Sequence, residues 1–132
     1  MTKADFIKAM FNRLDSYRED GMEASVKRNN HMNEFQGTEW NQKFADEILC
    51  RYIDFMNLIP EDKWQGSPVQ TSGEVLRLMS DQAIVFRNIL RRDGVILEGN
   101  LELVDAVLVD FINHVGVRAG VDWAMYTKDL GA

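Results

Sequence analysis

Leu101–Val115 reads LELVDAVLVDFINHV and is the clearest helix candidate in the chain. The segment is almost wholly apolar, yet it carries two carboxylates, Glu102 and Asp105, three residues apart. In an α-helix this spacing puts both side chains on one face, which argues against a strand. The pair is therefore either half of a divalent-metal site or the solvent-facing edge of a core helix.

Two neighbouring stretches also show apolar residues at helical spacing. Residues 39–59 carry a stripe that stops before Pro60, because proline cannot continue a helix. Residues 74–92 are apolar over about half of the circumference, which suggests a central helix. On that helix Gln82 falls inside the apolar half and is interpreted as a buried amide. Ile84 stands among polar residues and is interpreted as exposed. The apolar half comprises Val75, Leu78, Met79, Val85, Phe86, Ile89 and Leu90.

The rest of the chain completes the predicted fold. A helical stripe from Phe6 to Tyr17 is expected to end at Gly21, and residues 22–36 lack a clear period, which predicts a surface helix or an ordered loop. Both prolines lie within residues 60–73, so this is the predicted main loop, and residues 117–130 can form a last short helix. We expect an all-α protein with one domain, residues 1–132, built as an irregular bundle of four to six helices.

Composition narrows the functional classes. The chain has 132 residues, 45% of them apolar, which is enough for one core. Its net charge of -6 argues against direct binding of nucleic acid or of an anionic membrane, and favours basic protein surfaces as partners. A single cysteine, Cys50, excludes an intramolecular disulfide and fits a reducing compartment. Without a membrane-length apolar run or a signal-like start, we expect a cytoplasmic protein.

Few residues suggest chemistry. His31 and His114 are the only histidines, and no closely spaced set of zinc ligands occurs. A glycine-rich phosphate loop and a GxSxG nucleophile motif are also missing from the sequence. Nothing near Cys50 in sequence indicates a lowered thiol pKa. We therefore predict no catalytic residue from these patterns.

One pattern does resemble a known family. The segments TSGEVLRLM (71–79) and NLELVDAVLVDFINHVGVRAGVDWAMY (100–126) resemble the later part of the MazG-type all-α nucleoside triphosphate pyrophosphatases. In that family, an ExxE pair and an ExxD pair on facing helices hold Mg²⁺ ions that engage the triphosphate. The resemblance implies Mg²⁺ ligands at Glu74, Glu102 and Asp105. The first acid of the first pair is replaced by Thr71, so the implied ligand set is incomplete.

The competing hypothesis is a small acidic interaction protein. Short length, negative charge and the lack of a complete catalytic set are typical of inhibitor, antidefence or immunity proteins from phages and mobile elements. Such a protein would occlude a basic surface of a macromolecular target, towards which its carboxylates would steer it. The steering residues would be Asp15, Glu19, Glu23, Glu34, Glu39, Asp46 and Asp54, and the apolar anchors Phe35, Trp64 and Ile84.

A third hypothesis is a structural or assembly role as a homodimer. Ala106 and Val109 lie outside the main apolar stripe of helix 101–115, which indicates that this helix is covered on two sides. Self-association is compatible with the pyrophosphatase as well. Binding is favoured over catalysis, because it requires no residue that the chain lacks.

Overall fold

The computed structural model describes residues 3–29, 40–61 and 72–118, and every regular element among them is helical. The elements are α1 (Lys3–Asp20), α2 (Met22–Asn29), α3 (Gln42–Asn57), α5 (Ser72–Arg92), the 3-10 helix η2 (Glu98–Asn100) and α6 (Leu101–Arg118). The all-α prediction is confirmed for these residues. Most of the predicted main loop and of the last short helix lies outside them. Within them, no helix combines the length and apolar character needed to cross a bilayer.

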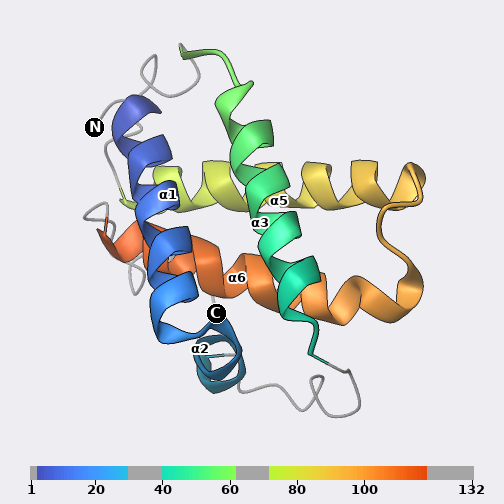
Figure 1. Cartoon of the computed structure of the whole chain (residues 1–132). Coiled ribbons are helices and arrows are strands. Elements are labelled where there is room, and N and C mark those ends of the chain that lie inside the picture. Colours follow the sequence, from blue (N-terminus) through green and yellow to red (C-terminus); the bar gives the residue numbers. More distant parts are fainter. Residues whose placement is uncertain (1–2, 30–39, 62–71, 119–132) are drawn as a thin grey trace.

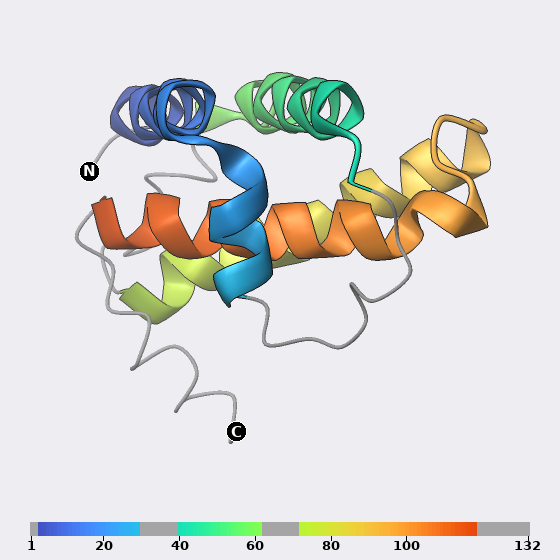
Figure 2. The same ribbon diagram turned by 60° about the horizontal axis from the view of Figure 1, so that its bottom comes forward.

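The helices form two layers. α1 and α3 lie side by side in opposite directions, and this pair crosses the pair formed by α5 and α6 (Figure 1). In the rotated view, α1 and α3 are seen nearly along their axes and lie above α6, and α2 lies beside α6 (Figure 2). At one end of the upper layer, Lys3 Nζ donates a hydrogen bond to the backbone oxygen of Asn57 at 2.6 Å. At the other end, Arg18 binds Asp46, so α1 is fastened to α3 at both ends.

α6 is the central helix, and it contacts α1, α2, α3 and α5. A helix that is apolar nearly all round is stable only when neighbours cover most of its sides. The suggestion that residues 74–92 are central is wrong, because α5 leaves Val85 exposed at 44%. Gln82 is likewise half-buried rather than buried. The buried residues of α6 are Leu103, Val104, Ala106, Val107, Leu108, Asp110, Phe111, Ile112 and Val115.

α3 begins at a side-chain cap and joins both layers. Asn41 accepts a hydrogen bond from the backbone N–H of Phe44 at 3.0 Å, which satisfies a donor that the first turn leaves unpaired. The predicted apolar stripe is confirmed, and its Tyr52 is fully buried. The Tyr52 ring meets the rings of Phe86 and Phe111 edge-on, and its hydroxyl donates to the backbone oxygen of Met79 at 2.8 Å. This one residue therefore packs α3 against α5 and α6.

α2 is anchored more firmly than its sequence pattern indicates. Gly21 has a φ of 92°, a left-handed conformation that suits glycine and ends α1. α2 then begins at once, and both Met22 and Val26 are fully buried. Because these two residues are four apart, they form a narrow apolar stripe that packs against α6. Residues 22–29 of the expected surface element are thus a helix with one buried edge.

A tight connection makes α5 and α6 an antiparallel pair. Gly94 has a φ of 76°, and the backbone N–H groups of Val95 and Ile96 both donate to the carbonyl oxygen of Leu90. Ile96 is buried, so the connection itself contributes to the core. Residues of all five α-helices described belong to one hydrophobic cluster.

Candidate functional site

An open groove of about 340 Å³ lies between α5 and α6. Each helix contributes one face, at positions i, i+3, i+4 and i+7: Ser80, Ala83, Ile84 and Arg87 from α5, and Asp105, Leu108, Val109 and Ile112 from α6. Most of these side chains are apolar. Ile84 and Val109 are 52% and 50% exposed, which confirms the exposed position predicted for Ile84. Exposed aliphatic side chains beside an apolar hollow are typical of a surface that receives another chain.

An ion pair crosses this groove. Arg87 Nη1 donates to both carboxylate oxygens of Asp105, at 3.1 and 3.0 Å. The two side chains are 28% and 42% exposed, so water reaches both and screens the interaction. Asp105, which the resemblance implies as a metal ligand, is therefore engaged by a cation that its own fold supplies.

The backbone of Glu74 lies far from the other two implied metal ligands. Glu102 is exposed one turn before Asp105, on α6. The Arg87 contact shows which part of α5 faces Asp105, and Glu74 lies 13 residues earlier on α5. At about 1.5 Å per residue, its backbone is about 20 Å away along the helix axis, beside the far end of α6. In the described part of the chain, no group of three or more His, Cys, Asp or Glu residues could hold a metal ion.

Acidic residues gather where α1 ends beside the start of α3. We name this group the acidic corner and define it as Asp15, Glu19, Asp20 and Asp46. Arg18 lies among them: its Nε and Nη2 donate to Asp46 at 2.8 and 2.9 Å, and its Nη1 is 3.9 Å from Asp15. These hydrogen bonds lower the pKa of the Asp46 carboxyl. Even when Lys43 of the first turn of α3 is included, the corner keeps an excess of negative charge.

Among the described residues, the predicted partner-binding side chains lie on more than one part of the surface. Asp15, Glu19 and Asp46 meet in the acidic corner, whereas Asp54 is exposed two turns further along α3. Ile84 lies on α5, in the other layer. Glu34, Phe35, Glu39 and Trp64 lie outside the described residues. Glu23 is on α2 and pairs with Lys27 at 2.7 Å.

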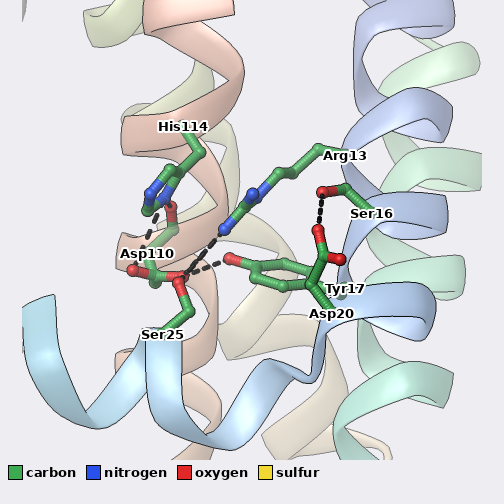
Figure 3. Close-up of polar contacts among 7 residues, drawn as sticks. All are labelled: Arg13, Ser16, Tyr17, Asp20, Ser25, Asp110 and His114. Atoms are coloured by element: carbon green, nitrogen blue, oxygen red, sulfur yellow. Dashed lines mark hydrogen bonds and ion pairs between the residues drawn. The ribbon is translucent and has the colours of Figure 1, made fainter.

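A buried carboxylate that the sequence analysis did not single out connects α1, α2 and α6. Asp110 of α6 is 1% exposed and accepts hydrogen bonds from the hydroxyls of Tyr17 and Ser25 (Figure 3). Arg13 Nη2 donates to the Ser25 hydroxyl at 3.1 Å and lies 3.8 Å from Asp110. His114 Nδ1 donates to the backbone oxygen of Asp110 at 2.8 Å. Buried charges are tolerated when paired and hydrogen-bonded in this way.

The hydrogen bonds around Asp110 connect α1 and α2 to α6 and stabilise the fold. Burial, followed by the nearby Asp110 carboxylate, raises the pKa of Tyr17 far above its usual range, so the phenol stays protonated and donates. The guanidinium of Arg13 also lies 4.1 Å from the centre of the Tyr17 ring. One signal in the sequence could have revealed the site: Asp110 interrupts an apolar run between Val109 and Phe111, where an unpaired charge would be costly.

Cys50 shows no sign of activation. Its thiol lies 3.7 Å from an oxygen of Asp46 and 3.6 Å from Arg18 Nη2. Burial raises the pKa of the thiol, followed by the effect of the Asp46 charge. The thiol is therefore protonated near neutral pH, which agrees with the expectation from sequence.

No protein-family model matches the chain, and comparisons with curated proteins and with solved structures give no significant match.

Proposed function

We propose that this chain is a small acidic interaction protein that binds and occludes a basic surface on a macromolecular target. The observation that carries the proposal is the acidic corner, where Asp46 and Asp15 lie beside the guanidinium of Arg18 and the exposed Glu19 and Asp20 follow it in the last turn of α1. Inhibitor, antidefence and immunity proteins of phages and mobile elements are the class that this mode of action suggests. The target would be a protein whose basic surface normally binds nucleic acid, in the cytoplasm.

The position of the corner on its helix supports a role beyond stability. Glu19 and Asp20 lie in the last turn of α1, where the helix dipole already places negative partial charge. Acidic side chains are unfavourable there, and they add to the negative potential instead of cancelling it. Arg13, two residues before Asp15, is largely buried and directs its charge towards Asp110. The exposed surface at this end of α1 is therefore more negative than its sequence suggests.

Negative potential of this kind acts mainly on the rate of association. Opposite charges steer two proteins together and orient them before contact, and salt screens the effect with a Debye length of about 10 Å at 0.1 M. The complex would then block the basic surface without any chemical step.

The test compares two variants that lose the same charge. Asp15→Asn, Glu19→Gln and Asp20→Asn together neutralise the corner, whereas Asp81→Asn, Asp93→Asn and Glu98→Gln remove three charges at exposed positions elsewhere. Immobilised proteins are exposed to host lysate at about 50 and 300 mM salt, and retained proteins are identified by mass spectrometry. We expect a basic protein to be retained at low salt by wild type and by the control variant, and lost by the corner variant. Retention of the same proteins by both variants would contradict the proposal.

A further inference from the structure

We propose that the groove between α5 and α6 is the contact surface for a second copy of this chain. The groove is apolar, is flanked by the half-exposed Ile84 and Val109, and carries one cation and one anion that come from different helices. These features are self-complementary about a two-fold axis, which is the usual symmetry of a homodimer.

The register of the two helices defines where such an axis can lie. α5 and α6 are antiparallel, and Arg87 of α5 is level with Asp105 of α6. A two-fold axis parallel to the groove places α5 of one copy over α6 of its partner. Rotation about this axis leaves the position of each residue along the groove unchanged. The result is a four-helix arrangement in which each helix runs opposite to its neighbours, a packing that occurs widely in helical bundles.

Charge complementarity favours a second copy of the chain as the partner at this groove. In that arrangement, Arg87 of each copy faces Asp105 of the other, so the two ion pairs become a ring of four alternating charges. Removing water from the ring strengthens each attraction, and every charge has an opposite neighbour on both sides. A partner that brought only apolar side chains would cover the existing pair without a new charged contact.

The apolar part of the groove fits the same axis. Ile84 of one copy is level with Val109 of the other, so the two most exposed aliphatic residues of the groove cover each other. Ser80 and Ala83 have small side chains, which lets the partner helix approach closely. The α1–α3 layer packs against another face of α6, where Tyr17 contacts Asp110 and Tyr52 contacts Phe111, and it stays on the outside of the dimer.

Mass measurement tests the proposal directly. For the full chain at about 100 µM, light scattering after gel filtration should give about twice the 15.2 kDa of one chain.

Ile84→Glu and Val109→Glu each place a charge at the centre of the contact, so we expect the dissociation constant of the dimer to rise about 30-fold or more. Leu97→Glu is the matched control, because Leu97 is 65% exposed outside the groove, and it should remain dimeric. Far-UV circular dichroism should be the same for all three variants. A wild-type monomer at this concentration, or a dimer that Ile84→Glu leaves intact, would overturn the proposal.

A charge exchange tests the axis itself. The Arg87→Glu chain carries two acids at this level of the groove, and the Asp105→Arg chain carries two bases, so each should be monomeric alone. When the two are mixed, each chain offers the charges that the other lacks, and the heterodimer should form. A mixture that stays monomeric would show that the ion pair acts only within one chain, and would overturn the assigned axis.

The dimer is independent of the acidic corner. Self-association through the groove should persist at about 300 mM salt, because it rests mainly on apolar contact and the two copies share a net charge of the same sign. The corner variant should therefore still dimerise, and Ile84→Glu should still bind a basic target. The mass measurement can therefore fail while target binding is retained, and target binding can fail while the dimer persists.

Discussion

Asp110 shows how a single carboxylate organises this fold. It lies in the most apolar helix, yet two hydroxyls and a guanidinium from α1 and α2 surround it. Each of these groups would be costly to bury without a partner. Their shared acceptor therefore makes the positions of α1 and α2 depend on each other.

The role of Asp110 can be measured by comparing two substitutions. Asp110→Ala removes the acceptor of the Tyr17 hydroxyl and the carboxylate that balances the Arg13 charge, so we expect a loss of about 3–5 kcal/mol of unfolding free energy. Asp110→Asn keeps one acceptor oxygen and should lose only about 1–3 kcal/mol. Urea denaturation followed by circular dichroism measures both. A loss below about 1 kcal/mol for Asp110→Ala would show that the site tolerates Asp110 rather than using it.

The buried tyrosines predict a marked loss of stability in alkali. Burial raises the pKa of both Tyr17 and Tyr52 in the folded chain, whereas unfolded tyrosines ionise near pH 10. Below pH 10 both states are protonated and the free energy of unfolding is unaffected. Above it only the unfolded state releases protons, so each tyrosine should lower that free energy by up to about 1.4 kcal/mol per pH unit.

Denaturation between about pH 8 and 11 checks this dependence. Tyr17→Phe is expected to start from a lower stability, because one hydrogen bond is lost, but to fall less steeply above pH 10. A slope equal to that of wild type would show that Tyr17 ionises normally in the folded protein.

Among the helices, α3 has the clearest local start signal. Asn41→Ala should lower the unfolding free energy by about 1 kcal/mol, because the N–H of Phe44 then loses its acceptor. Gln42→Ala is the control, since Gln42 is exposed one position later and its side chain accepts from the Trp40 indole N–H rather than from a backbone N–H of the helix. Thermal melts of both variants suffice, and an unchanged midpoint for Asn41→Ala would argue against the cap.

The elements differ in how well their sequence predicts them. The stripe of α3 and the apolar run of α6 each repeat at helical spacing over several turns, and both helices are confirmed with ends within a few residues. α2 has only eight residues, and helices of that length are marginal by themselves. Its stability comes from Met22 and Val26 buried against α6, which a local pattern does not contain. The same reason explains why α5 was wrongly placed at the centre.

At the scale of the whole molecule, the register of α5 and α6 bears on the Mg²⁺ hypothesis. Since the backbone of Glu74 is far from Asp105 along the helix pair, we expect about 5 mM Mg²⁺ or Mn²⁺ to leave the melting temperature unchanged. We also expect no release of pyrophosphate from nucleoside triphosphates. Glu102→Gln should match wild type in both assays. A rise in melting temperature that Glu102→Gln abolishes would instead support a metal site and the resemblance to the pyrophosphatases.

Local spacing along the chain determined that the described residues form helices, where most of them begin and end, and that Ile84 is exposed, because these properties depend on residues within one or two turns. Tertiary structure decided which helix is central, that Tyr17 and Asp110 meet across 93 residues, and that Arg87 rather than a second acid faces Asp105. The physical reason is that pairing between helices depends on packing geometry, in which a shift of one turn brings a different side chain into contact.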